Sequence, residues 1–165
     1  MKFTIKKNLR LSGAQASIYT IFNEEDKETS LEQFYRENIE NFREEVSDIF
    51  QRLKTIGHKH GARIGYFKEN EGTDGDGICA LYDNPKSNLR LYCIRNGSCN
   101  VILGGGGNKP KDKRRYQEVP KLNEEVDFLK SVSNLFLKRV VAKEIRYTND
   151  GLDLEGDLTF EEEDL

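Results

Sequence analysis

The segment Leu89–Tyr116 constrains the fold more than any other part of the chain. Residues Leu89–Arg95 have the pattern of a β-strand, Asn96-Gly97 follows, and a second apolar run occupies Cys99–Leu103. Asn-Gly between two such runs favours a two-residue type I′ turn, because both central residues of that turn need a positive φ. The segment therefore predicts a β-hairpin within an antiparallel sheet.

A glycine-rich and basic stretch follows the predicted hairpin. Gly104–Gly107 are four consecutive glycines, which we expect to form a loop that is mobile or closely approached by a ligand. A phosphate loop of the GxxxxGK[ST] type is excluded, because Lys109 is followed by Pro110 and not by Ser or Thr. The cations of this stretch are Lys109, Lys111, Lys113, Arg114 and Arg115.

Charge is distributed unevenly along the chain, although the whole sequence of 165 residues carries a net charge of only −3. The segment from Lys86 to Lys121 contains nine Lys or Arg residues and two acidic residues, a net charge of +7. The segment from Glu144 to Leu165 contains nine acidic residues and one Arg, a net charge of −8. This asymmetry indicates a basic patch that faces a polyanion, and an acidic tail. We expect one domain over residues 1–147 and an acidic extension over 148–165, of which Glu161–Asp164 is disordered.

Hydrophobic periodicity predicts two helices. Apolar residues recur every three or four positions from Leu31 to Ile56, which is typical of one long amphipathic helix. Ser30 and Gln33 fit a capping box at its start, and Gly57 fits the C′ position. A second helix begins near Pro120 and extends at least to Val140, with Ile145 at its end.

Alternating apolar residues predict strands on both sides of the long helix. An N-terminal hairpin is expected over residues 3–11 and 14–22, and further strands over 62–67 and 78–82. The fold class that follows is α+β, with a mainly antiparallel sheet, one long helix before the central strands and one helix after them.

Other site chemistries are disfavoured by the sequence. His58 and His60 are the only histidines, and with no further ligands at metal spacing we expect a solvated helix end and no metal site. The three cysteines, Cys79, Cys93 and Cys99, are expected to be free thiols, although Cys93 and Cys99 could face each other across the hairpin. We expect no cofactor, no membrane segment and a cytoplasmic location.

The remaining candidate site is the basic stretch together with Arg90 and Arg95 on the first hairpin strand. Guanidinium groups bind phosphate oxygens through paired donors, and lysines add positive charge. Tyr92 and Tyr116 could stack on a base or transfer a proton. From composition alone, phosphate binding and an exposed solubilising loop explain this stretch equally well.

The segment Asn88–Tyr92, followed by Val101–Leu103 and a lysine-rich loop, resembles the RelE/HigB family of toxins from toxin–antitoxin systems. In that family an arginine on a strand, a strand that ends in Leu, and a lysine-containing segment with Pro precede a final helix. Arg90, Leu103 and the pair Lys109 and Lys111 match these positions, and the resemblance covers roughly residues 60–143. It implies a RelE-like core of a small antiparallel sheet flanked by helices.

The resemblance also implies metal-independent mRNA cleavage by attack of a ribose 2′-OH on the adjacent phosphate. The catalytic residues would be Arg90, Lys109, Lys111 and Tyr116, and the RNA-binding residues Tyr92, Arg95, Lys113, Arg114 and Arg115. The partners would be mRNA or the ribosome, and an antitoxin protein. The chain departs from the family pattern in its acidic net charge, its acidic tail and its glycine run, which bear on catalysis more than on fold.

Two further hypotheses come from the sequence. The basic loop of a non-catalytic interaction domain would dock an acidic protein partner, in place of RNA. Independently of which partner is correct, the acidic tail could fold over the basic loop and mask it. A purely structural role for the chain is the third alternative.

Overall fold

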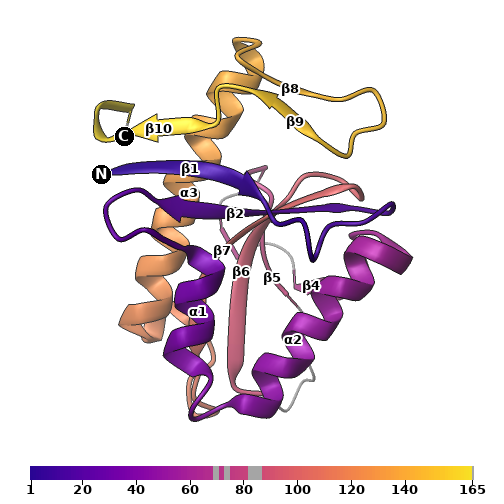
Figure 1. The fold of residues 1–165 in the computed structure, drawn as a ribbon. Helices are drawn as coiled ribbons and strands as arrows, with labels where there is room; N and C mark the ends of the chain where they lie inside the picture. Colours follow the sequence, from indigo (N-terminus) through magenta and orange to yellow (C-terminus); the bar gives the residue numbers. More distant parts are fainter. Residues whose placement is uncertain (69–70, 73–74, 82–86, 165) are drawn as a thin grey trace.

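The computed structural model describes residues 1–68, 71–72, 75–81 and 87–164 (Figure 1). Three α-helices, ten strands and several short helical turns follow one another along this part of the chain. The helices are α1 (Ser30–Asn38), α2 (Arg43–Thr55) and α3 (Pro120–Val141). The strands are β1 (Lys2–Lys7), β2 (Ser17–Asn23), β3 (Glu28–Thr29), β4 (Phe67–Lys68), β5 (Ile78–Leu81), β6 (Leu89–Arg95), β7 (Asn100–Asn108), β8 (Ile145–Tyr147), β9 (Leu154–Gly156) and β10 (Thr159–Glu161).

Most strands form one mixed sheet with the order β10-β1-β2-β7-β6-β5-β4, and β3 pairs with β2 at its margin. Its described pairings are antiparallel except for the parallel pair of β2 and β7. The central strands β5, β6 and β7 run as an antiparallel meander. The predicted α+β class with a mainly antiparallel sheet is therefore confirmed.

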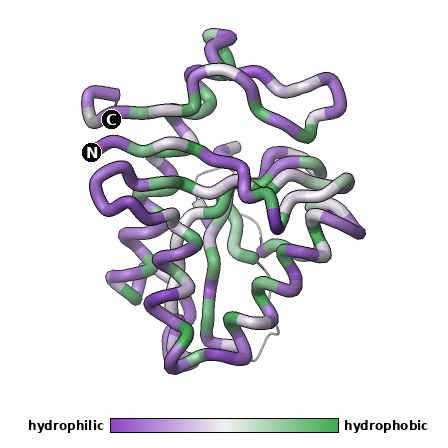
Figure 2. The backbone as a smooth tube through the Cα atoms, in the orientation of Figure 1, coloured by the Kyte–Doolittle hydropathy of each residue, from purple (hydrophilic) through white to green (hydrophobic). Residues whose placement is uncertain are grey.

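The sheet separates two hydrophobic cores, and β6 contributes to both because its side chains alternate between the two faces. Leu91 and Cys93 pack in the core shared with α1 and α2. Tyr92 and Ile94 pack in the core shared with α3. Figure 1 shows α1 and α2 in front of the central strands and α3 behind them, and Figure 2 shows apolar segments converging on these strands.

The long helix predicted before the central strands is wrong, because the chain forms two helices with a break at residues 39–42. The buried Asn38 side chain donates to the carbonyl of Phe34 at 2.8 Å, a local bond that favours the end of a helix over its interior. The cap at the start of α1 also differs from the prediction. Thr29 and Glu32 form the capping box, while Ser30 donates to the Leu103 carbonyl and so bridges β2 to β7.

α2 ends at Thr55 with Ile56 as its C-cap, so Gly57 is at the predicted C′ position, but the chain stays helical there. A π-helical turn over Ile56–His60 follows α2, and Gly61 with a φ of 76° ends it. Glycine at position 57 allows this turn to approach the backbone of Leu11 closely, because a Cβ there would lie 1.9 Å from the Leu11 carbonyl oxygen. His58 and His60 are exposed on this turn, as expected for a solvated helix end.

The central hairpin is confirmed, but its turn is not type I′. Residues 96–99 form the turn, and Gly97 has a φ of 71° whereas Asn96 is not among the residues with positive φ. The glycine loop is also a wrong prediction, since Gly104–Gly107 are buried residues of β7. They allow close packing: a Cβ on Gly106 would lie 1.8 Å from the Arg90 carbonyl oxygen.

The cysteines are free, as the sequence suggested. Cys99 lies in the turn, so it does not face Cys93 across the hairpin. The residue opposite Cys93 is the buried Cys79 on β5, with 3.5 Å between the two Sγ atoms. Burial raises the pKa of the Cys93 thiol. Both cysteines are buried and pack as small apolar core residues.

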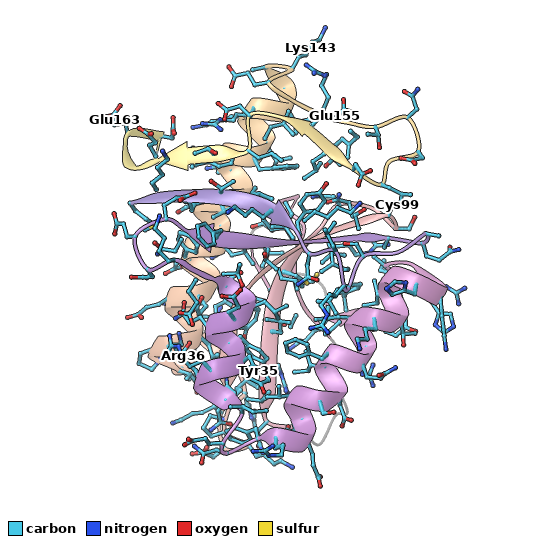
Figure 3. All side chains as sticks on the ribbon, in the orientation of Figure 1. Tyr35, Arg36, Cys99, Lys143, Glu155 and Glu163 are labelled. Atoms are coloured by element: carbon cyan, nitrogen blue, oxygen red, sulfur yellow. The ribbon has the colours of Figure 1, made fainter. Side chains whose placement is uncertain are left out.

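The C-terminal segment after α3 is ordered over its described residues, in contrast to the disorder predicted for Glu161–Asp164. Ile145 belongs to β8, which pairs with β9, while β10 pairs with β1. Arg139 near the end of α3 packs 3.9 Å above the Phe160 ring. Figure 3 shows Lys143, Glu155 and Glu163 at separate points of the C-terminal part of the chain, all on the far side of β1 from α1 and α2. No helix in the described part of the chain is long and apolar enough to cross a membrane.

Candidate phosphate-binding pocket

A pocket of about 260 Å³ lies on the α3 face of the sheet, in front of the N-terminal end of α3. Its floor is a row of residues across three strands, because Lys68 on β4 pairs with Ala80 on β5, and Ala80 pairs with Tyr92 on β6. Ala80 is the small member of this row and leaves space above it. Arg90 is two residues before Tyr92 and therefore points to the same face.

The wall of the pocket comes from the basic segment between β7 and α3 (residues 109–115) and the turn that follows it. Tyr116 is buried and its ring meets Tyr92 edge to face, with 5.9 Å between the ring centroids. Glu118 accepts hydrogen bonds from the backbone N–H groups of Arg115 and Arg114, which hold the pKa of its carboxyl below the usual range. These contacts fix the basic segment over the end of the sheet.

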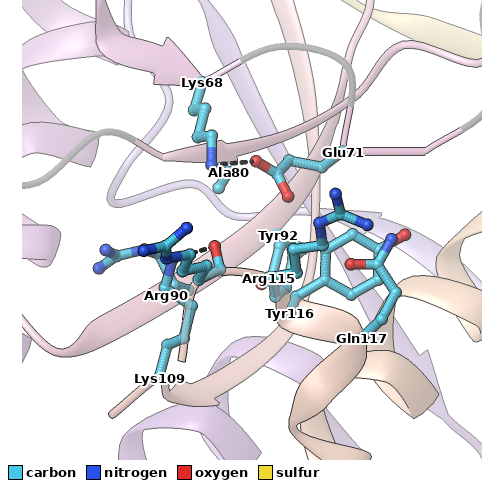
Figure 4. A pocket seen from close by; sticks show the side chains of 10 residues that line it. Lys68, Glu71, Ala80, Arg90, Tyr92, Lys109, Arg115, Tyr116 and Gln117 are labelled. Atoms are coloured by element: carbon cyan, nitrogen blue, oxygen red, sulfur yellow. Dashed lines mark hydrogen bonds and ion pairs between the residues drawn. The ribbon is translucent and has the colours of Figure 1, made fainter. Parts of the chain in front are cut away.

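Among the residues that the structure describes, five cationic side chains and one carboxylate line this pocket (Figure 4). The cations are Lys68, Arg90, Lys109, Arg114 and Arg115, and the carboxylate is Glu71. The Glu71 side chain is about one tenth exposed and pairs with Lys68 at 3.1 Å. One carboxylate balances only part of this charge, so the pocket favours an anion.

The positions of Arg90 and Lys109 are set by backbone contacts. The Arg90 guanidinium donates to the carbonyl oxygens of Leu89 at 2.8 Å and Ser87 at 3.1 Å. The backbone N–H of Lys109 donates to Asn88, which extends the β6–β7 ladder by one bond. Arg90 still has guanidinium donors that these two contacts do not use.

Two of the pocket residues have shifted pKa values. Burial, followed by the nearby charges of Arg90 and Lys68, lowers the pKa of Lys109. Burial and the Glu71 carboxylate raise the pKa of Tyr92 well above its ordinary value, so its hydroxyl stays protonated at neutral pH. A bound anion would relieve the repulsion on Lys109.

The structure brings together six of the nine residues chosen from the sequence. These are Arg90, Tyr92, Lys109, Arg114, Arg115 and Tyr116. Lys111 and Lys113 belong to the same segment but do not line the pocket. Arg95 lies at the other end of β6, where its Nε donates to the Ala62 carbonyl at 2.8 Å, so it does not line this pocket, and its role toward RNA stays a prediction.

Sequence reasoning missed Lys68, Glu71, Ala80 and Gln117, which also line the pocket. Lys68 and Ala80 reach it only through the pairing of β4 with β5, and no local motif encodes that register. Among the described residues, no cluster of three or more His, Cys, Asp or Glu side chains is arranged to hold a metal ion.

The acidic tail, over the residues that the structure describes, does not cover the pocket. The pocket lies at the N-terminal end of α3, whereas Arg139 near the C-terminal end contacts Asp157 and Asp164 of the tail. The helix has 22 residues and is therefore about 33 Å long, so the two contacts lie far from the pocket.

No protein-family model, curated protein or solved structure matches the chain.

Proposed function

We propose that the pocket binds a phosphate group of single-stranded RNA. The observation that carries this proposal is the convergence of five cations, from β4, β6 and the basic segment, on a hollow that also holds two tyrosines. Phosphate oxygens are the natural partners of clustered Arg and Lys donors.

A polyanion fits better than a single small anion, because the positive charge continues beyond the pocket. Lys111 is exposed and Lys113 is half-buried on the same segment, next to Arg114 and Arg115 at the pocket wall. Neighbouring phosphates of one strand would contact these side chains in turn. RNA is favoured over DNA because the Glu71 carboxylate and the tyrosine hydroxyls can pair with a ribose 2′-OH.

Metal-independent cleavage of the bound strand, as the resemblance to RelE/HigB toxins implies, is part of the same proposal. Arg90 and Lys109 would stabilise charge on the phosphate in the transition state. Of the acid–base candidates, Tyr92 has a raised pKa that keeps its hydroxyl protonated, so Tyr116 and Glu71 are the better candidates for proton transfer. Lys111, outside the pocket, would contribute to binding only.

Fluorescence anisotropy with a labelled single-stranded RNA of about 12 nucleotides tests this proposal. Arg90→Gln and Lys109→Gln should each weaken binding about ten-fold, and together lower the slope of log Kd against log salt by about 1.4. Lys138→Gln, an exposed cation near the other end of α3, is the matched control and should leave both values unchanged.

Two outcomes would contradict the proposal. One is RNA affinity that is equal in the wild type and the double variant. The other is no RNA affinity at all, together with a stable complex between the basic segment and an acidic protein, which would support the interaction-domain hypothesis instead.

A further inference from the structure

A second hollow lies on the opposite face of the sheet, between α1 and α2. One part, of about 680 Å³, is bounded by the β1–β2 turn and includes Leu9, Leu31 and Tyr35. A neighbouring part, of about 410 Å³, includes Ile39 and Arg43. Both parts share Tyr35, Phe50 and Lys54, so they form one surface, named here the α1–α2 groove. Figure 1 shows the two helices diverging from the joint at residues 39–42.

The α1–α2 groove presents apolar side chains to solvent. Leu9 is 80% exposed, and Tyr35 is 47% exposed where it meets Phe50 edge to face, at 5.9 Å between the centroids. Figure 3 shows Tyr35 on α1 at the side of the gap between the helices. The Leu9 turn is held firmly, because the Asn8 side chain accepts hydrogen bonds from the N–H groups of Arg10 and Leu11. The chain therefore displays a large apolar residue on a fixed turn.

The rim of the groove is cationic. Its lining carries five Lys or Arg residues and a single acid, Glu32, which already serves the α1 capping box. Lys7 is paired with Asp153 at 2.6 Å, whereas Arg10, Arg43 and Lys54 form no ion pair with any residue that the structure describes. An apolar floor with these three unpaired cations at its rim matches a ligand of the reverse pattern, apolar on one side and acidic at its edges.

We propose that the α1–α2 groove binds an acidic amphipathic helix of a partner protein. Two diverging helices leave room for a third, whose apolar residues at i, i+3 or i+4, and i+7 would contact Leu9, Tyr35 and Phe50. Its flanking Glu and Asp residues would pair with Arg10, Arg43 and Lys54. The groove lies on the α1–α2 face and the phosphate pocket on the α3 face, so this proposal is independent of the RNA proposal and both ligands can bind together.

Selection from an unbiased display library of peptides of about 16 residues, roughly four helical turns, tests the proposal on the full chain. Peptides are selected on the wild type after removal of those that also bind Leu9→Ser. The enriched peptides should be acidic and carry apolar residues at helical spacing. In solution, a labelled peptide from this set should bind Leu9→Ser and Lys54→Glu about ten-fold more weakly than the wild type.

Matched controls come from the far end of the molecule. Val141 is 83% exposed, a fraction similar to that of Leu9, and Lys138 is an exposed cation. Val141→Ser and Lys138→Glu should therefore leave peptide affinity unchanged. Enriched peptides without acidic or amphipathic character, or equal affinity for Leu9→Ser and the wild type, would overturn the proposal. A dimer of the chain that Leu9→Ser abolishes would also overturn it, by assigning the groove to a second copy.

Discussion

Tyr92 and Tyr116 meet edge to face at 5.9 Å, and this contact joins the central strand β6 to the basic segment that walls the pocket. Both rings are buried. Tyr116→Ala should therefore destabilise the fold by about 3 kcal/mol, measured by urea denaturation, and should weaken RNA binding as the segment loses its support.

Tyr116→Phe removes the hydroxyl and keeps the ring, so it distinguishes the contribution of the hydroxyl from that of ring packing. The variant keeps the edge-to-face contact, so its stability should stay within about 0.5 kcal/mol of the wild type. If Tyr116 transfers a proton during cleavage, this variant should bind RNA normally and cleave it at least about 100-fold more slowly. Unchanged cleavage by Tyr116→Phe would remove Tyr116 from the chemistry.

Of the described residues that line the pocket, Glu71 is the one carboxylate beside five cations. Glu71→Gln removes its repulsion of an incoming phosphate, so RNA affinity should rise about five-fold, or about 1 kcal/mol. If Glu71 acts as a base, cleavage should fall in the same variant, which separates the two roles. A fall in RNA affinity would show that the carboxylate supports binding through Lys68.

RNA binding should depend on pH through Lys109. Burial and two neighbouring cations lower its pKa, so its positive charge is lost at a lower pH than for an ordinary lysine. A bound phosphate raises this pKa again, so RNA binding is coupled to proton uptake, and affinity should fall as pH rises through the pKa of the free protein. Titrations at several pH values should show a flatter dependence for Lys109→Arg, which stays charged. An equally steep profile for Lys109→Arg would assign the pH dependence to another group.

The glycines of β7 provide a test of the fold with adjacent matched variants. A Cβ on Gly106 would lie 1.8 Å from the Arg90 carbonyl oxygen, whereas a Cβ on Gly107 would make an ordinary contact at 3.4 Å with the Leu122 side chain. Gly106→Ala should cost about 3 kcal/mol or more of stability, measured by chemical denaturation. Gly107→Ala should change it by less than about 1 kcal/mol. Two neutral variants would indicate a loop at this place, as the sequence alone suggested.

The ordered C-terminal segment depends on a buried bond from Tyr19, whose hydroxyl accepts from the Leu154 N–H at 2.8 Å. Burial raises the pKa of Tyr19, so the hydroxyl remains neutral. Tyr19→Phe leaves the Leu154 donor without this partner and should cost about 1–3 kcal/mol. Hydrogen exchange should quicken in β9 while the β6–β7 ladder stays protected. Tyr35→Phe, on an exposed tyrosine, is the control.

Local chemistry predicted a large part of this fold. Asn96-Gly97 marked the central hairpin and Pro120 marked the start of α3, because both depend on backbone geometry that only a few residue types favour. The hairpin and the start of α3 also bracket six of the pocket residues that the sequence indicated, namely the two on β6, the three on the basic segment, and Tyr116 directly after it. Their roles toward RNA stay predictions.

The remaining features depend on tertiary structure. Gly104–Gly107 belong to strand β7, where a Cβ on Gly105 would meet Glu125 of α3 and one on Gly106 would meet the Arg90 backbone. Glycine propensity alone indicates a loop, so the sequence did not show this packing. The helical spacing of apolar residues continues through residues 39–42, although the helix is broken there. The spacing continues because the apolar residues of α1 and of α2 pack in the same hydrophobic core. Lys68 lines the pocket because β4 pairs with β5 in a register that no local motif encodes. Arg95 does not line it, because this residue lies at the opposite end of β6.

Photo-crosslinking of RNA that contains 4-thiouridine, with the attached peptides identified by mass spectrometry, tests the central claim most directly. We predict crosslinks at Tyr92 and within residues 109–117, and their loss in the Arg90→Gln, Lys109→Gln double variant but not in Lys138→Gln. Crosslinks confined to other surfaces, such as the α1–α2 groove, or crosslinks that the double variant keeps, would contradict the assignment of the pocket to RNA.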